Sequence, residues 1–332
     1  MSAHPSWKSE LAAAVRDPDT LCAALGLPAP VQPAAADNFP MRVPPAWRAL
    51  IRTGDPDDPL LRQTLPRPEE DEDITGFGAD PVGDGAATVV PGLLHKYTGR
   101  ALLIAHGACA IHCRYCFRRH YPYSDQRLDR RRRTTALAAL AADPSIEEVI
   151  LSGGDPLLLD NTSLGELLDG LTAIGHLRRL RIHSRIPVVL PSRIDAELIE
   201  RLHSTSLALV VVIHANHANE LGAEAATALA ALRTTGATLL NQSVLLRGIN
   251  DSAEALTALS ERLFACGVLP YYLHALDRVA GAAHFEVDDT TAAALMQAIR
   301  ERLPGYLVPR WVREVAGQPF KVPVEALPTR AT

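Results

Sequence analysis

Between residues 101 and 274 the chain alternates short, continuous apolar runs with longer amphipathic segments. Six runs carry this pattern: ALLIA at 101, EEVILSGG at 147, RRLRIHS at 178, LALVVVIH at 207, TLLNQSVLL at 238 and LPYYLH at 269. From the second run onward their starts lie about thirty residues apart, which accommodates a strand, a helix and a return. The pattern therefore predicts six parallel βα units.

Strands without alternation of apolar and polar positions are typical of a parallel sheet that is covered on both faces. The expected fold is therefore α/β, an incomplete (βα)6 TIM-like barrel rather than a closed barrel of eight units. Catalytic residues of such barrels lie at the carboxyl ends of the strands. Polar or reactive residues follow the predicted strands: Cys109 to Cys116, Ser152 to Asp155, His183 to Arg185, His214 to His217, Gln242, and His274 to Asp277.

The regions outside the barrel pattern differ from it in composition. From Trp7 to Leu27 apolar residues recur at helical spacing, and a proline-rich connector follows. A second connector, acidic and then rich in glycine, runs from Pro66 to Gly85. We expect a helical N-terminal extension with its connectors over 1–88 and the barrel core over 89–290. A C-terminal helix and the segment that contains Lys321 are expected over 291–332.

Composition excludes several classes of protein. The net charge of −5 and the pI near 6.2 do not indicate a basic surface that would bind nucleic acid. The basic run Arg130–Arg133 is interpreted as a solvent-exposed face. No signal peptide or membrane span is recognisable, so we expect a cytoplasmic protein. Five cysteines do not form a secreted disulfide framework, and Cys22 and Cys266 are expected to be plain buried side chains.

The remaining three cysteines, Cys109, Cys113 and Cys116, fall within the stretch GACAIHCRYCFRR. A structural zinc site needs four ligands, so His112 or His120 would have to complete it. A 4Fe-4S cluster held by three thiolates instead leaves its fourth iron open to a further ligand. The odd number of thiols then has a functional meaning.

The stretch CAIHCRYC resembles the CxxxCxΦC signature of radical S-adenosylmethionine (SAM) enzymes, with Tyr115 at the aromatic position. The resemblance implies that SAM binds the open iron and that one electron from the cluster cleaves it to a 5′-deoxyadenosyl radical. Ser152-Gly153-Gly154-Asp155 looks like the second-strand motif of these enzymes, although two glycines alone also build tight turns. The implied SAM contacts are Tyr115, Gly153, Gly154, Asp155, His214 and Gln242.

Residues 89 to 325 are similar to the lysine 2,3-aminomutase family. The matching stretches are PGLLHKYTGRALL, CRYCFRR, LSGGDPLLL, SRIPVVLPSRI, LNQSVLLRGIND and KVPV. The resemblance implies a second cofactor, pyridoxal 5′-phosphate (PLP), bound as a Schiff base to Lys321, one of only three lysines in the chain. It also implies that Arg118 grips the carboxylate of L-lysine and that Asp277 and Glu314 hold its far ammonium, with Glu314 standing where an aspartate is usual. Lys96, Tyr97 and Arg100 match residues that grip the phosphate of PLP.

Further features indicate which metabolic role an aminomutase with this sequence would have. Catabolic lysine aminomutases continue beyond the lysine segment, whereas this chain has eleven residues after Lys321. Together with Glu314 and the stretch LDRVAGAAHFEV, this resembles the aminomutases of elongation factor P β-lysylation, which convert L-α-lysine to (R)-β-lysine. The implied partners are elongation factor P, its lysyl ligase, and an electron donor such as flavodoxin or ferredoxin. A catabolic or biosynthetic free-lysine aminomutase, another radical SAM enzyme, and a non-catalytic iron-sulfur or zinc protein are the alternatives.

Overall fold

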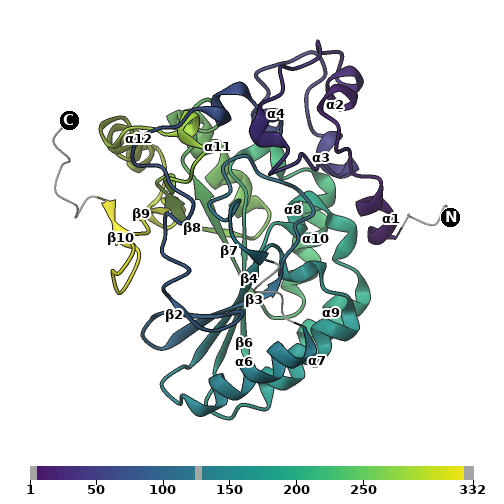
Figure 1. Ribbon diagram of the computed structural model, residues 1–332, viewed down its shortest axis with the longest axis vertical. Coiled ribbons are helices and arrows are strands. Elements are labelled where there is room, and N and C mark those ends of the chain that lie inside the picture. Colours follow the sequence, from purple (N-terminus) through teal and green to yellow (C-terminus); the bar gives the residue numbers. More distant parts are fainter. Residues whose placement is uncertain (1–5, 124–128, 325–332) are drawn as a thin grey trace.

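A computed structural model describes residues 6–123 and 129–324, and its strands form one sheet in chain order (Figure 1). Strands β3 to β9 pair in parallel, whereas β1 and β2 at one edge and β10 at the other pair antiparallel. The strands are β1 Thr88–Val90, β2 Leu93–Tyr97, β3 Arg100–His106, β4 Glu148–Gly153, β5 Arg179–Ser184, β6 Ala208–Ile213, β7 Thr238–Val244, β8 Leu269–His274, β9 Arg310–Arg313 and β10 Val322–Pro323. The six predicted strands are β3 to β8, so the incomplete barrel is confirmed, with β9 as a seventh parallel strand that the pattern did not predict.

Helices follow the parallel strands. The α-helices are α1 Trp7–Ala12, α2 Pro18–Ala24, α3 Pro45–Arg48, α4 Pro59–Arg62, α6 Arg130–Ala142, α7 Asn161–Thr172, α8 Ile186–Val189, α9 Ala196–His203, α10 Ala223–Arg233, α11 Ala253–Ala265 and α12 Asp289–Arg302. The 3-10 helices are η1 Ala34–Ala36, η2 Pro68–Asp71, η3 Pro156–Leu158, η4 Pro191–Arg193, η5 Ala218–Glu220, η6 Ala283–Phe285 and η7 Gly305–Leu307. Asp160, Asp195 and Asp288 each accept the backbone N–H three residues later, which explains where α7, α9 and α12 begin.

The two faces of the sheet differ, so the incomplete barrel is confirmed but the expectation that both faces of its sheet are covered is not met. Helices α6, α7, α9 and α10 lie along one side (Figure 1). On β5, Leu180 and Ile182 are fully buried, whereas the alternate residues Arg181 and His183 line a cavity on the other face. Because the sheet curves, its concave face surrounds a space instead of packing against helices. An apolar run does not distinguish a strand beside a cavity from one beneath a helix.

The predicted N-terminal helical region contains two short helices: α1 ends at Ala12 and α2 begins at Pro18. The Asp17 carboxylate caps α2 by accepting from the N–H of Thr20, and proline is tolerated at this first position because its missing N–H would have no partner in the helix. This region does not stand apart from the barrel. Its buried residues share one apolar cluster with barrel strands, as illustrated by Leu21, Trp47, Leu60, Leu103 and Leu151.

The C-terminal strands β9 and β10 form an antiparallel pair in which Val322 lies opposite Arg313. Glu314 and Lys321 are the residues next to this pair, so the hairpin brings them together although seven positions separate them. Cys22 and Cys266 are buried, as predicted. Within the part of the chain that the structure describes, no helix is long and apolar enough to cross a membrane.

Candidate active site

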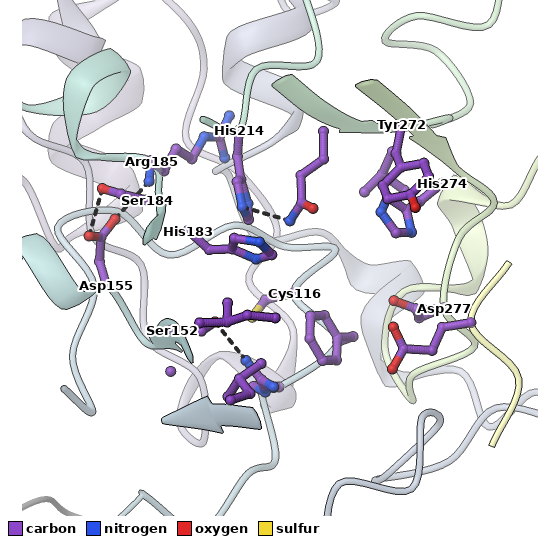
Figure 2. Close-up of a pocket in the computed structure, with 18 of the residues that line it drawn as sticks. Cys116, Ser152, Asp155, His183, Ser184, Arg185, His214, Tyr272, His274 and Asp277 are labelled. Atoms are coloured by element: carbon purple, nitrogen blue, oxygen red, sulfur yellow. Dashed lines mark hydrogen bonds between the residues drawn. The ribbon is translucent and has the colours of Figure 1, made fainter. Parts of the chain in front are cut away.

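A cavity of about 520 Å³ opens on the concave face of the sheet (Figure 2). Every residue predicted to bind the cluster, SAM, PLP or the substrate lines it: Lys96, Tyr97, Arg100, Cys109, Cys113, Tyr115, Cys116, Arg118, Gly153, Gly154, Asp155, His214, Gln242, Asp277, Glu314 and Lys321. Its volume is in the range of cavities that bind small molecules and cofactors. The fold thus gathers around one space residues that lie more than two hundred positions apart, while the role of each stays a prediction.

The three thiols reach the cavity from the loop that follows β3. Burial, and then the neighbouring Cys113, raise the pKa of Cys116 to about 11, and burial raises the pKa of Cys109 as well. Such thiols are protonated when alone, and a bound cation displaces the proton to give thiolate ligands. The donor set therefore fits an iron-sulfur cluster.

The zinc alternative finds no support in the same loop. His112, through Nδ1, and His120, through Nε2, each contact a backbone carbonyl oxygen, of Pro40 at 2.7 Å and of Ala280 at 3.2 Å. Among residues 6–123 and 129–324, no group of three or more histidine, cysteine, aspartate or glutamate side chains is arranged to hold a metal ion. A preformed structural zinc site is thus not built by the described residues.

The two glycines after β4 have a packing reason. A Cβ on Gly154 would lie 2.4 Å from the carbonyl oxygen of Ala108, and one on Gly153, whose φ is 122°, would lie 2.5 Å from that of His106. The N–H of Gly154 donates to the oxygen of His106 at 2.8 Å. The glycines let the start of the cysteine loop lie directly on the end of β4, and their predicted contact with SAM stays a prediction.

The carboxylate of Asp155 is occupied by the protein itself. It accepts from Ser184 Oγ at 2.8 Å and from the backbone N–H groups of Arg185 at 2.7 Å, Leu157 at 3.1 Å and Ile186 at 3.2 Å (Figure 2). Burial raises the pKa of Asp155 to about 6, although these hydrogen bonds favour the charged form. Asp155 thus joins the end of β4 to the corner after β5, and its predicted contact with SAM stays a prediction.

Neutral imidazoles line the middle of the cavity. His214 Nε2 lies 2.8 Å from Gln242 Nε2, and burial followed by the charge of Arg185 lowers the pKa of His214 to about 3 (Figure 2). The Nε2 atoms of His183 and His274 are buried and find no hydrogen-bond partner among the described residues. Buried polar atoms are nearly always paired, so these two atoms fit a cavity that takes up a polar ligand.

A cluster of acidic and basic side chains forms another part of the cavity lining. Lys321 Nζ lies 2.6 Å from Glu314 Oε2, and Lys96 Nζ lies 3.0 Å from Glu314 Oε1 and 2.6 Å from Asp84 Oδ1. Burial alone would raise the pKa of Glu314, but the two ammonium groups hold it well below its usual value. Burial and then the charge of Glu314 raise the pKa of Asp277 to about 7. Of the two carboxylates predicted to face an ammonium, Glu314 is therefore charged and Asp277 titrates near neutral pH.

Arg118 is held rather than free. Its Nε donates to Asp84 Oδ2 at 2.7 Å, and its Nη1 donates to Ser152 Oγ at 3.1 Å. Asp84 thus links two predicted ligand-binding residues, Arg118 and Lys96, and sequence reasoning missed it. It lies in the glycine-rich connector, where no periodic pattern marks a buried residue.

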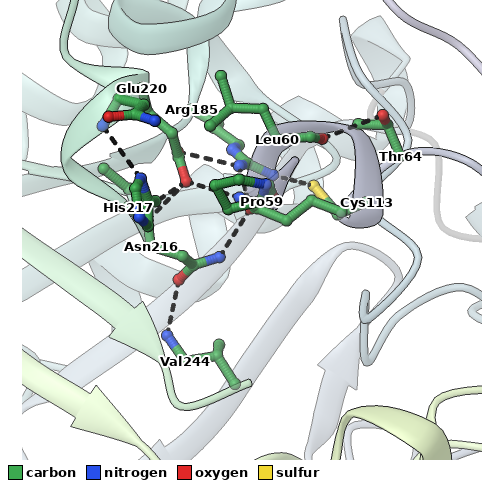
Figure 3. Close-up of polar contacts among 12 residues, drawn as sticks. Pro59, Leu60, Thr64, Cys113, Arg185, Asn216, His217, Glu220 and Val244 are labelled. Carbon is green, nitrogen blue, oxygen red and sulfur yellow. Dashed lines mark hydrogen bonds and ion pairs between the residues drawn. The ribbon is translucent and has the colours of Figure 1, made fainter. Parts of the chain in front are cut away.

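A second polar network, also missed, lies beneath the cysteine loop (Figure 3). Arg185 donates from Nη1 to Cys113 Sγ at 2.6 Å and from Nη2 to Glu220 Oε2 at 3.0 Å. Asn216 donates to the Tyr115 hydroxyl at 2.7 Å, and Gln63 joins the same group by donating to Glu220 at 2.9 Å. Arg185 and Asn216 were visible as polar residues after strands, but nothing in the sequence marks Gln63 or Glu220 as buried.

Residues 98–177 match the family described as "4Fe-4S single cluster domain". The chain is 47% identical to L-lysine 2,3-aminomutase of Escherichia coli (strain K12) over 96% of its length and 94% of that protein, and 35% identical to L-lysine 2,3-aminomutase of Clostridium subterminale over 86% and 68%. A radical SAM methyltransferase from Sphaerobacter thermophilus aligns over 68% of this chain and 72% of its own, with 18% identity and a TM-score of 0.45. With identity at this level across nearly the whole of both sequences, the chain belongs to the L-lysine 2,3-aminomutase family.

Proposed function

We propose that this chain converts L-α-lysine to (R)-β-lysine with a 4Fe-4S cluster, SAM and PLP. One observation carries the proposal: the three cysteines and Lys321 line the same cavity, and Lys321 Nζ lies 2.6 Å from the carboxylate of Glu314. A radical enzyme of another class needs the cysteines but not the lysine. Family membership supports the same reading.

Cys109, Cys113 and Cys116 would hold the cluster, which together with SAM supplies the radical that starts the reaction. The uncharged side chains His214 and Gln242 would face SAM, which is a cation. Burial, and then the charge of Arg185, keep His214 neutral, so this side chain adds no positive charge beside the sulfonium. An uncharged neighbour repels a cation less than a protonated one, most of all in a site with little water.

Lys321 would hold PLP, which supplies conjugation for an unpaired electron while an amino group moves between adjacent carbons. Glu314, whose Oε2 lies 2.6 Å from Lys321 Nζ, would position this amine for the cofactor and would also face the ammonium at the far end of the substrate.

The substrate would lie between Arg118 and the pair Asp277 and Glu314. Arg118 presents a planar fork suited to a carboxylate, and its bonds to Asp84 and Ser152 fix the orientation of that fork. Asp277 titrates near pH 7 without substrate, so an ammonium beside it would favour its charged form. A diamino acid with one carboxylate matches this distribution of charge.

We place the reaction in the β-lysylation of elongation factor P, in the cytoplasm. The support is the resemblance in the stretch LDRVAGAAHFEV and the presence of Glu314 where an aspartate is usual. The product would pass to a ligase that attaches it to the factor, and a flavodoxin or ferredoxin would supply the electron.

The test is an anaerobic assay of the reconstituted protein with L-lysine, dithionite and SAM, followed by chiral analysis of the product. We expect (R)-β-lysine, together with the absorbance of bound PLP. A protein with a cluster but without PLP would instead be a different radical SAM enzyme. Addition of purified elongation factor P and its ligase, with mass measurement of the factor, separates the β-lysylation pathway from use of free β-lysine.

A further inference from the structure

The N-terminal region covers the loop that carries the cysteines. We call residues 39–70 the cover segment and residues 107–119 the cysteine loop. Arg42 Nη1 donates to the carbonyl oxygen of Cys109 at 3.0 Å, and the N–H of His112 donates to the oxygen of Arg42 at 3.1 Å. The N–H of Arg114 donates to the oxygen of Gln63 at 2.9 Å. Backbone groups on both sides of Cys113 are therefore bonded to the cover segment.

Glu70 is the buried centre of this contact. Its Oε1 accepts from Arg114 Nε at 2.8 Å, and its Oε2 accepts from Arg119 Nη2 at 2.7 Å and from a second nitrogen of Arg114. The side chains of Glu70 and Arg114 are 0% exposed and that of Arg119 is 1% exposed. Burial by itself would raise the pKa of Glu70, but the two guanidinium groups outweigh it and hold the pKa below its usual value.

The two arginines stand at the two ends of a short segment that contains Cys116. Arg114 also directly follows Cys113, and Arg119 donates back to the carbonyl oxygen of Arg114 at 3.1 Å. One carboxylate thus fixes both ends of Arg114–Arg119. Ordering a loop without regular secondary structure around a cluster costs conformational entropy. The Glu70 contacts order the loop before the cluster binds, and this lowers the entropy cost of binding.

We propose that Glu70 is a positioning residue for the iron-sulfur cluster, and that the N-terminal region serves to hold the cysteine loop in its cluster-binding conformation. The inference rests on the proposed function, since it requires that the loop binds the cluster. It assigns a role to a region outside the barrel. The contact is a buried carboxylate shared by two guanidinium groups, in which removal of the one negative charge leaves two positive charges unpaired.

The test compares Glu70→Gln with Glu147→Gln after anaerobic reconstitution. Glu147 is the control because its carboxylate also pairs with two arginines, Arg178 and Arg179, but it directly precedes β4, at the end of the strand opposite the cysteine loop, and lies outside the cavity lining. Iron release to a chelator is followed well below the melting temperature of each iron-free variant. We expect release from Glu70→Gln to be about tenfold faster or more, since breaking a buried ion pair is strongly destabilising, with altered electron paramagnetic resonance of the reduced cluster. Glu147→Gln is expected to keep the wild-type rate and spectrum.

Arg42→Met is a milder second variant, because it removes one hydrogen bond to Cys109 and leaves the buried ion pairs in place. It should also release iron faster than wild type, and it decides the matter if Glu70→Gln does not fold. Wild-type release and spectra in the folded variants, with only a lower melting temperature, would overturn the inference. Wild-type protein that takes up no iron would contradict the proposed function, and this inference with it.

Discussion

Lys321 Nζ lies 2.6 Å from Glu314 Oε2, and the other oxygen of the same carboxylate lies 3.0 Å from Lys96 Nζ. In the ligand-free protein one glutamate therefore serves two of the three lysines in the chain. The arrangement connects the predicted cofactor lysine with the predicted substrate-binding carboxylate. The same carboxylate therefore lies where both the cofactor and the substrate are proposed to bind.

Lys321→Ala should lose the covalent PLP adduct and keep its cluster, because Lys321 is not one of the predicted cluster ligands Cys109, Cys113 and Cys116. Conversion of α- to β-lysine should disappear, while uncoupled SAM cleavage under strong reduction survives. Borohydride reduction followed by peptide mass analysis measures the adduct. Lys8→Ala is the control and should retain it. Normal β-lysine production by Lys321→Ala would refute the proposed role.

Cys113→Ala should bind little iron and should not cleave SAM, because a methyl group cannot replace a thiolate ligand. Reconstituted wild-type protein is expected to hold about four iron atoms per chain, as a 4Fe-4S cluster requires. Cys266→Ala is the matched control, since Cys266 is buried and stands alone in an apolar cluster. Iron and sulfide analysis measures both variants. Full iron content in Cys113→Ala would exclude this residue as a ligand.

Gly154→Ala should destabilise the protein by about 1–3 kcal/mol or more and impair cluster uptake, because the new Cβ would lie 2.4 Å from the backbone of Ala108. That contact is with backbone, which cannot move aside without shifting the cysteine loop. Gly175→Ala is the control, since nothing lies within 4 Å of a Cβ placed there. Chemical denaturation measures the free energy of unfolding of each variant. Equal stability of the two variants would contradict the close packing described here.

The raised pKa of Asp277, about 7, predicts a pH dependence. Between its ordinary value of 3.8 and about 7 the folded protein binds more protons at this group than the unfolded chain, so Asp277 lowers the stability of ligand-free protein as pH rises through that window. Asp277→Asn should therefore lose less stability than wild type from about pH 5 to pH 7. Melting temperatures of both proteins across this range measure the difference. Parallel curves would show that Asp277 is already ionised in the folded state.

Asp277→Asn should also weaken binding of L-lysine to PLP-loaded protein, by a few kcal/mol, because it removes one of two charges that face the ammonium. Cluster content and SAM cleavage should stay at the wild-type level. Calorimetry measures lysine affinity, and Arg278→Gln is a neighbouring control whose ion pair with Glu286 lies outside the cavity lining. Unchanged lysine affinity in Asp277→Asn would place the ammonium elsewhere.

The chain order and the spacing of its apolar runs were sufficient to predict the incomplete barrel, because each strand and its helix bury apolar surface in a local, periodic way. The cysteine stretch and the polar residues after the predicted strands could be recognised as one candidate site, because parallel strands bring their carboxyl ends to one edge of the sheet. Lys96, Tyr97, Arg100, Glu314 and Lys321 follow no such pattern and were predicted only from the resemblance to the aminomutase family.

Only the tertiary structure decided how those residues are held. Three carboxylates in connectors or short helices without a periodic pattern pair with arginines of the site from far along the chain: Glu70, Asp84 and Glu220. Gln63 joins this group by donating to Glu220. The alternation that marks the concave face of β5 likewise acquires its meaning only when the sheet curves around a cavity. Burial of a charge depends on which distant segments meet, and neither residue type nor local spacing contains that information.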